Sequence, residues 1–332
     1  MAVRTIHIGV GGRGVWPLDA MAHRTDFQPV ALVDIRHDKL EAARQRTGLG
    51  PQACFHSLEE ALEAVPADAV VVITPPDFHA KHCHLALQAG RHVLVEKPFT
   101  KDLGTADALV RLAAAARLQL EVCQNRRFGP ACQTLRRLLA DGVYGKPRYG
   151  LLTTFGWRPG VHHSGTDRHS YLWERGIHDL DTIAALIGSA PQRLWAHSFN
   201  PPASPYAGGA ALHGWVEFAG GVSFGLLCTF AAHGRGSRLH VECDEAALVL
   251  EGQRLLVHRR GVAAAEELAL DSVRPAEERL LDDFHQAVTG GVEPESSGAR
   301  NLITVALVEA MGAASDQGRV LDFADYLRTR TG

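Results

Sequence analysis

The sequence has no long apolar run and no excess of basic residues. No stretch of about 18 consecutive apolar residues occurs, so the pattern excludes a membrane-spanning helix. The 34 Lys and Arg residues stand against 37 Asp and Glu residues, and the net charge is −3. A nucleic-acid-binding protein typically carries a basic patch and a clear positive balance. We therefore expect neither a membrane nor a nucleic acid as a partner.

Cysteine is scarce, and the six cysteines are scattered. They form no CxxC pair and no spacing typical of a disulfide framework or of a zinc site. The N-terminus, MAVRTIHIGVGGRG, passes from a short strand pattern into glycines, without the apolar region and cleavage site of a signal peptide. Scattered reduced thiols are typical of cytosolic proteins, so we expect a cytoplasmic protein.

The chain does contain enough apolar material for two domains. Its 332 residues are 46% hydrophobic and 21% charged, as in an ordinary globular protein. In residues 1–123 helical patterns alternate with apolar, β-rich runs: TIHIGV, PVALVD, AVVVIT, HVLVE and LQLEVC. Continuous apolar strands separated by helices indicate a parallel sheet that is covered on both faces. We predict a doubly wound α/β domain of the Rossmann type.

The pattern changes after residue 123, and residues 124–332 indicate a second domain. Helical patterns at 129–142 and 170–188 are followed, from residue 193 to 260, by short strands that turn residues separate. Helical patterns return toward the C-terminus. We predict an α+β domain with a large, mostly antiparallel open sheet and helices on one face.

A glycine-rich loop follows the first predicted strand. The segment IGVGGRG gives the pattern Gly9-x-Gly11-x-x-Gly14 at the start of a predicted helix. Such a loop permits a tight turn and a close approach of the backbone to a pyrophosphate, and the helix N-terminus attracts the phosphates. A second strand ends at Asp34, about 20 residues later, where a ribose-binding carboxylate is expected. This context favours dinucleotide binding over a structural turn without a ligand.

The choice between NAD and NADP depends on two neighbouring side chains. Asp34 can bind the adenosine ribose hydroxyls and repels a 2′-phosphate, which favours NAD. Arg36 could instead hold a 2′-phosphate or stack on the adenine. We expect NAD, with NADP as the alternative.

Another predicted strand, later in the first domain, ends on two charged residues. The segment VLVEKPFT, residues 93–100, is an apolar strand that ends on Glu96 and Lys97 and stops at Pro98. Ligands of an open parallel sheet bind outside the carboxyl ends of its strands, so both charges are expected near the nicotinamide. A half-desolvated lysine there can hold a substrate oxygen and transfer a proton. A surface ion pair is the plainer alternative.

These residues carry a resemblance to a known family. AGRHVLVEKPFT closely resembles the EKP signature of the Gfo/Idh/MocA oxidoreductases, which include glucose–fructose oxidoreductase and inositol dehydrogenase. ITPPDFHAKHCHLALQAG is similar to the TPxxxH segment of the same family. The likeness continues through QNRRF, WERGIHDLD and the C-terminal ESSGARNLITVALVEAMGAASDQGRVL, so it covers essentially the whole chain. This combination of segments identifies the family, but it says almost nothing about which substrate the protein uses.

The resemblance implies a role for each matching position. The glycines would hold the pyrophosphate, Lys97 would be the catalytic lysine, and other residues would border the ribose and the nicotinamide. Together with neighbouring loop residues, the predicted cofactor contacts are Gly9, Gly11, Gly12, Arg13, Gly14, Asp34, Arg36, Thr74, Pro75, His79, Glu96, Lys97, Asn125 and Arg126.

The helix that should complete the site departs from the family pattern. The family usually has an aspartate four residues before a histidine, whereas Glu174 precedes His178 here. By helical period Glu174, His178 and Asp181 share one polar stripe beside an apolar one. We assign Lys97 and His178 to the substrate oxygen, with Glu174 as orienter or polyol ligand and Asp181 as a substrate contact. The alternative is a solvated helix face.

A basic segment, WRPGVHHSGTDRHSYLW, precedes this helix. Its Arg158, His162 and His163 are candidate substrate contacts, and its charge suggests a polyhydroxylated or carboxylated sugar. The histidines also suggest a metal site, but no HExxH or HxxxH with a convergent carboxylate occurs there. We expect no metal.

Taken together, the sequence predicts an NAD(P)-dependent dehydrogenase acting on CH–OH groups. It would move a hydride between the nicotinamide and a secondary alcohol of a sugar, an inositol or a related polyol. Two alternatives stay open: an enzyme with tightly held NAD that cleaves glycosides through transient oxidation, and a non-catalytic sensor. The resemblance also implies a homodimer or homotetramer formed through the C-terminal sheet.

Overall fold

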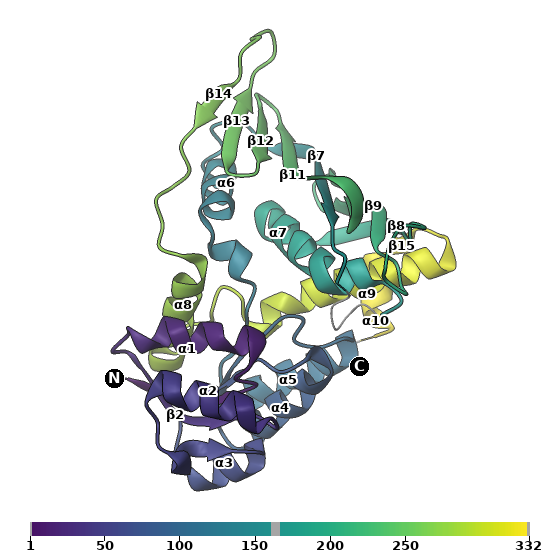
Figure 1. Cartoon of the computed structure of the whole chain (residues 1–332). Helices are drawn as coiled ribbons and strands as arrows, with labels where there is room; N and C mark the ends of the chain where they lie inside the picture. Colours follow the sequence, from purple (N-terminus) through teal and green to yellow (C-terminus); the bar gives the residue numbers. More distant parts are fainter. Residues whose placement is uncertain (1, 161–166, 331–332) are drawn as a thin grey trace. The chain divides into compact units, whose positions relative to one another are not determined.

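The computed structural model describes residues 2–160 and 167–330. The chain divides into two compact units, coloured along the sequence in Figure 1. The first unit comprises Met1–Asn125 together with Glu277–Leu302. The second comprises the remaining residues, 126–276 and 303–332.

This division differs from the predicted one in one segment. The predicted boundary after residue 123 lies close to Asn125, but residues 124–332 do not form a single unit, because Glu277–Leu302 belongs to the first. There, the N–H of Val122 donates to the carbonyl of Ser296 at 2.9 Å. Ser297 forms an antiparallel bridge with Glu121, the residue before Val122. The late segment thus covers a sheet edge, and such a long-range pairing leaves no trace in local periodicity.

Among the described residues, the first unit has a six-stranded parallel sheet in the order β3-β2-β1-β4-β5-β6. The strands are β1 (Val3–Ile8), β2 (Phe27–Val33), β3 (Cys54–Phe55), β4 (Ala69–Val72), β5 (His92–Val95) and β6 (Leu120–Val122). All four residues of β4 are buried, as expected for a central strand covered on both faces. The prediction of a doubly wound sheet is confirmed, although β3 was missed because two residues show no periodicity.

The helices that connect these strands begin and end where local chemistry dictates. Ser57 and Asp102 cap two of them, since each side chain accepts a hydrogen bond from the backbone N–H three residues later. The helices are α1 (Val15–Ala22), α2 (His37–Thr47), α3 (Leu58–Ala64), α4 (Pro76–Gln88) and α5 (Leu103–Ala115). Near the C-terminus the chain adds α8 (Ala276–Gly290) and α9 (Gly298–Gln317), the latter running on into the second unit.

Among the described residues, the second unit contains a nine-stranded sheet in the order β14-β13-β12-β11-β7-β10-β9-β8-β15. Only the pairing of β7 with β10 is parallel among these described strands, so the predicted, mostly antiparallel sheet is confirmed. The strands are β7 (Pro147–Trp157), β8 (Pro191–Phe199), β9 (Ala211–Phe218), β10 (Val222–Thr229), β11 (Ala231–Cys243), β12 (Ala247–Glu251), β13 (Arg254–His258), β14 (Glu266–Leu268) and β15 (Leu321–Asp322).

Helices cover one face of this sheet. The helices of the second unit are α6 (Pro130–Asp141), α7 (Ile177–Ile187), α10 (Phe323–Arg328) and the later part of α9. Ser315 of α9 accepts a hydrogen bond from the N–H of Ser198 on β8 at 2.9 Å, which ties helix to sheet. Leu152 and Thr154 of β7 are buried, whereas their neighbours along the strand are not.

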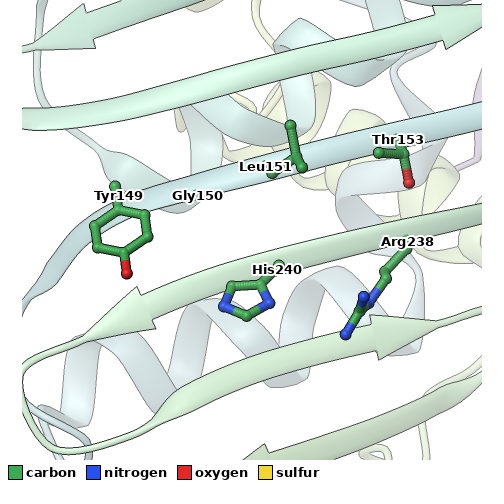
Figure 2. A pocket seen from close by; sticks show the side chains of 6 residues that line it. All are labelled: Tyr149, Gly150, Leu151, Thr153, Arg238 and His240. Carbon is green, nitrogen blue, oxygen red and sulfur yellow. The ribbon is translucent and has the colours of Figure 1, made fainter.

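The opposite face of the sheet is open and apolar. Its exposed large apolar side chains come from β7 and β10: Tyr149, Leu151, Phe155, Trp157 and Leu227. A pocket on this face is lined by Tyr149, Gly150, Leu151, Thr153, Arg238 and His240, the side chains drawn in Figure 2. The alternation along β7 therefore places apolar groups on both faces of the sheet.

The helix that carries the predicted catalytic histidine does not begin as an α-helix. Leu172–Gly176 forms a π-helical turn directly before α7. Because such a turn takes more residues than an α-helical one, Glu174 is displaced from the stripe that regular helical spacing predicts. Single π-turns are rare, and sequence periodicity gives no signal for them.

In the part of the chain that the structure describes, no helix is both long and apolar enough to cross a membrane.

Candidate active site

Two glycines of the loop after β1 are required by packing. Gly9 has a φ of +82°, and a Cβ there would lie 2.5 Å from the carbonyl oxygen of Ile73. A Cβ on Gly14 would lie 1.7 Å from the carbonyl oxygen of Gly9. Both contacts are shorter than any real Cβ tolerates, so the turn can close only with glycine at these positions.

The middle of the loop is open instead. Gly12 has a φ of +52°, and its Cβ position has no neighbour within 4 Å. Gly12 is exposed and Gly11 half-buried, so their backbone is accessible to a ligand. The first turn of α1 follows at once, and its N–H groups have no partner inside the helix. This cradle fits a pyrophosphate, which the backbone and the helix N-terminus would bind.

Asp34 lies at the carboxyl end of β2. It is half-buried, and its Oδ1 accepts a hydrogen bond from the N–H of Arg36 at 2.9 Å. The Arg36 side chain turns to Asp38 and donates to both of its carboxylate oxygens, at 3.1 and 2.8 Å. The arginine considered for a 2′-phosphate is therefore paired with a carboxylate, while Asp34 remains available for a ribose.

The strand end at β4 and that at β5 are joined by one histidine. His79 is 1% exposed, and its two ring nitrogens lie 2.6 Å from the carbonyl oxygen of Thr74 and 2.7 Å from that of Pro98. Burial lowers the pKa of His79. Pro75 sits at the start of α4, as the N-cap. His79 thus fixes the backbone around two predicted cofactor contacts.

The end of β5 carries the glutamate and lysine of the EKP motif. Glu96 is 5% exposed, and its Oε1 accepts a hydrogen bond from Nε of Arg13 at 2.8 Å. Its Oε2 accepts the N–H of Lys97 at 2.6 Å. The peptide bond between Lys97 and Pro98 is cis. A buried carboxylate is thus paired with the glycine loop and fixes the backbone of the half-buried lysine.

Asn125 closes the first unit. Its Nδ2 donates to Oε1 of Glu277 at 2.9 Å, at the start of α8. This contact joins the end of the segment Met1–Asn125 to the returning segment of the same unit.

In the second unit, the glutamate that replaces the family aspartate is held by an arginine. Glu174 is buried, and its Oε1 accepts a hydrogen bond from Arg158. The Arg158 guanidinium also lies over the ring of Phe230, 4.5 Å from its centroid. Arg158 and Glu174, both predicted from the sequence, therefore form one ion pair beside α7.

Asp181, predicted as a substrate contact, lies buried within the second unit. Asp181 is 1% exposed, and Arg127 binds it through two hydrogen bonds of 2.7 Å each. Thr304 of α9 donates a third, at 2.9 Å. A buried carboxylate with these partners ties three elements together and leaves no surface for a ligand.

A second carboxylate on α7 has a different surrounding. Asp179 is 2% exposed, and its Oδ1 accepts hydrogen bonds from Arg126 at 2.9 Å and from Arg175 at 3.3 Å. Its Oδ2 accepts the hydroxyl of Tyr171 at 2.8 Å. Burial lowers the pKa of Arg126, Asp179 opposes this, and Arg175 adds to it. Two cations thus meet at one buried anion.

The remaining predicted residues divide between described and undescribed parts. His178 is half-buried in the first turn of α7. His162 and His163 lie outside the described residues. Within the described residues, no three His, Cys, Asp or Glu side chains are grouped so that they could hold a metal ion.

Sequence reasoning missed three residues that organise this region. They are Arg127, Tyr171 and Asp179, and each is buried and hydrogen-bonded to a partner on another turn or element. The doubled arginine of NRRF and the two aspartates of IHDLD were the available signal, since two cations and two anions in such segments invite pairing. Which cation pairs with which anion depends on the tertiary structure.

The fold and these residues agree with the family comparisons. Residues 3–124 match the family described as an oxidoreductase family with an NAD-binding Rossmann fold, and residues 132–249 match the GFO/IDH/MocA C-terminal domain. The chain therefore belongs to the Gfo/Idh/MocA oxidoreductase family. It is an NAD(P)-dependent oxidoreductase, and the prediction from the EKP and TPxxxH segments is confirmed.

Individual relatives are similar over most of the chain. D-apiose dehydrogenase from Paraburkholderia graminis is 29% identical over 314 residues, which cover 88% of this chain and 82% of the relative. Inositol 2-dehydrogenase from Corynebacterium glutamicum is 29% identical over 183 residues, covering 55% and 53%. An oxidoreductase from Agrobacterium radiobacter, solved with NAD+, L-tartaric acid and magnesium, superposes with a TM-score of 0.88. Its identity is 20%, over 98% of this chain and 99% of that one, so it shows the shared fold.

Proposed function

We propose that the protein oxidises a secondary alcohol of a sugar, a cyclitol or a related polyol with NAD. The observation that carries this proposal is the end of β5, where buried Glu96 is paired with Arg13 of the glycine loop and fixes Lys97. A paired carboxylate at this position is costly to maintain without a function, because burying a charge requires a compensating partner. Bound NAD supplies the hydride acceptor.

The protein groups then have separate tasks. Lys97 holds the hydroxyl oxygen of the substrate and stabilises negative charge on it. The hydrogen bond from its backbone N–H to Glu96 fixes the main chain from which the ammonium group extends. His178, on the first turn of α7, accepts the hydroxyl proton, because an imidazole can act as a general base. Glu174 and Arg158 form a neutral pair that presents polar groups to the polyol.

The pairing of Arg36 supports NAD as the preferred cofactor. Arg36 donates two hydrogen bonds to Asp38, and Asp34 lies at the strand end where the ribose hydroxyls bind. A 2′-phosphate would meet the Asp34 carboxylate and an arginine whose charge is already compensated. NADP is therefore the poorer ligand.

The names of the relatives support a polyhydroxylated substrate. They include D-apiose dehydrogenase, UDP-N-acetylglucosamine 3-dehydrogenase and inositol 2-dehydrogenase. Each name describes the oxidation of a carbohydrate or a cyclitol. The common element is a polyhydroxylated substrate.

The direct test is NADH formation at 340 nm across sugars, inositols, aldonates and uronates, with NADP in parallel. Reduction of NAD by one of these compounds supports the proposed reaction. Product formation without net NADH would instead favour transient oxidation, for example in glycoside cleavage. NAD binding with no conversion of any compound would favour a sensor.

Lys97→Ala tests the role of the lysine. We expect NAD affinity to stay within a few-fold and turnover to fall at least about 100-fold, because a positioned group that stabilises the developing negative charge on the substrate oxygen contributes that much. Lys81→Ala is the matched control, since Lys81 is exposed and pairs with Glu59 on α3. Unchanged turnover in Lys97→Ala would refute the assignment.

We also propose that the open face of the nine-stranded sheet joins subunits into a homodimer or homotetramer. Tyr149, Leu151, Phe155 and Trp157 are between 39% and 57% exposed and alternate along β7, so they share one face. Contiguous exposed apolar surface of this kind usually marks a protein interface.

We further propose that the protein works in the cytoplasm. All six cysteines, each in the described part of the chain, are free thiols, and five of them are buried. Unpaired cysteines are typical of a reducing compartment.

A further inference from the structure

Two arginines of the second unit are arranged differently from the ion pairs around them. Arg126 and Arg175 both donate to Oδ1 of Asp179, and the second oxygen of that carboxylate is taken by Tyr171. One carboxylate thus faces two guanidinium groups. The cluster of Arg126, Arg175 and Asp179 carries one net positive charge.

The Arg127–Asp181 pair in the same unit shows what a purely structural arrangement looks like. There, one arginine meets one aspartate through two hydrogen bonds of 2.7 Å, and the two side chains are 8% and 1% exposed. Charge is balanced and the pair is sealed from solvent. Arg126 is the neighbour of Arg127 in sequence, so both arginines occupy the same part of the fold. Their different pairing therefore does not come from a different location.

The two arginines at Asp179 differ in both respects. Their side chains are 34% and 24% exposed, while Asp179 itself is 2% exposed. Each makes one hydrogen bond to Asp179, and neither has a further hydrogen-bond acceptor among the described residues of the second unit. Every guanidinium has five N–H donors, so several donors of each group remain for a ligand. The undescribed residues 161–166 contain no Asp or Glu.

We propose that Arg126 and Arg175 bind the carboxylate of the substrate, which makes the substrate an acidic sugar or a related polyhydroxy acid. This inference rests on the proposed function, because it specifies the substrate class of the same site. It gives Arg126 a substrate in place of the cofactor contact that the family resemblance implies.

The chemistry favours a carboxylate over other anions. Guanidinium groups bind carboxylates through paired, parallel hydrogen bonds, and the half-buried position strengthens such bonds relative to water. One net positive charge balances one carboxylate, whereas a sugar phosphate or a nucleoside diphosphate brings a larger negative charge. Buried Asp179, held by Tyr171, fixes the direction of both arginines before the ligand arrives.

The position also fits the proposed reaction. Arg175 is the last residue but one before α7, and His178 follows within the first turn of that helix. Arg175 and Asp179 are four residues apart, so their side chains lie on the same face of the helix and meet there. A substrate whose carboxylate is bound here has its hydroxyl carbons within reach of the helix that carries the proposed proton acceptor.

The test compares matched acids and neutral sugars. D-glucuronate and D-glucose, and D-galacturonate and D-galactose, differ in one carboxylate, and D-gluconate and glucose 6-phosphate extend the panel. Binding is measured by calorimetry on the NADH-loaded protein, in which no oxidation occurs, and kcat and KM are measured with NAD. We expect at least one acid to bind at least about 10-fold more tightly than its neutral partner, and salt to weaken that binding.

Arg175→Met removes the charge and keeps the length of the side chain. We expect this variant to lose at least about 10-fold in affinity for the acid, mainly in KM, and little for the neutral sugar. Arg175→Lys should recover part of the affinity, because it restores charge without the planar fork. Arg193→Met is the control, since Arg193 pairs with Glu217 in the same unit.

The outcomes separate this inference from the proposed function. NAD reduction by neutral polyols, with no preference for acids and no effect of Arg175→Met, would refute the inference alone. Tighter binding of acids that Arg175→Met abolishes, without NADH formation, would support the site and contradict the dehydrogenase reaction. A preference for glucose 6-phosphate over every carboxylate would refute the assignment of the anion.

Discussion

At the scale of single residues, function depends on charges that the fold has already paired. Glu96 is the clearest case. A carboxylate and an ammonium at the end of a buried strand are unexpected in the sequence, and the structure resolves the conflict by pairing Glu96 with Arg13 of the glycine loop. Glu96 also binds the backbone N–H of Lys97, the next residue and the proposed catalytic lysine.

Cofactor choice is also decided by single residues. Asp34→Ser should raise KM for NAD and shift the ratio of kcat/KM for NADP over NAD by at least about 10-fold. The reason is that the variant loses the ribose ligand and the negative charge that repels a 2′-phosphate. Steady-state kinetics with both cofactors measures this ratio.

The control for that experiment is Glu41→Gln on α2. Glu41 pairs with Arg44 within the helix, so its loss removes one nearby negative charge without changing the strand end. An equal shift in Glu41→Gln, or no shift in Asp34→Ser, would contradict the assignment of Asp34 as the selector.

At the scale of elements, the segment that returns to the first unit places a buried acid in an unusual position. Glu121 of β6 is fully buried, and Ser296 donates to its Oε1 at 2.9 Å. Burial raises the pKa of Glu121 well above its usual value, and the carboxylates of Asp283 and Glu295 raise it further. At pH values between the unfolded and the folded pKa, the folded protein therefore keeps the proton on this carboxyl group, whereas the unfolded chain releases it.

This arrangement makes stability depend on pH. Because the folded pKa lies above the unfolded one, the stabilisation is complete below about pH 4.5 and is lost as pH rises through the folded value. Glu121→Gln keeps the shape and a donor but does not titrate. Between the unfolded and the folded pKa, the free energy of unfolding of the parent should fall by on the order of 1 kcal/mol per pH unit. We expect the Glu121→Gln variant to lack this fall.

Urea denaturation of both proteins at pH 5 and pH 8 measures this difference. The parent protein should lose more stability than Glu121→Gln between the two values. Glu63→Gln, at an exposed glutamate on α3, should behave like the parent. A parent whose stability is the same at both pH values, or greater at pH 8, would count against a protonated Glu121.

At the scale of the whole molecule, the open sheet face predicts self-association. The double variant Leu151→Glu, Leu227→Glu places two charges among the exposed apolar side chains of β7 and β10. Desolvating these charges in an interface is costly, so we expect a monomer by light scattering where the parent is a dimer or tetramer. Circular dichroism should show an unchanged fold.

Val143→Glu is the matched control for the sheet variants. Val143 is 64% exposed and lies in the turn after α6, outside the strands that form the sheet face. Its variant should keep the parent's mass. If the double variant keeps that mass too, subunits do not associate through this face.

The sequence alone determined the features that local physics controls. Apolar strands alternating with helices gave the parallel sheet, turn-separated strands gave the antiparallel one, and the glycine loop with Asp34 gave the cofactor class. Gly9 and Gly14 are required by backbone contacts that any such turn makes, so the pattern alone is informative. Each of these signals lies within a few consecutive residues.

Only the tertiary structure decided which distant residues meet. Asp181 looked like a site residue because helical spacing aligns it with His178, but Arg127 and Thr304 bury it. The return of Glu277–Leu302 to the first unit was invisible for the same reason. Long-range pairing depends on which charged and polar groups the packing of separate elements brings together, and periodicity along the chain holds no record of that.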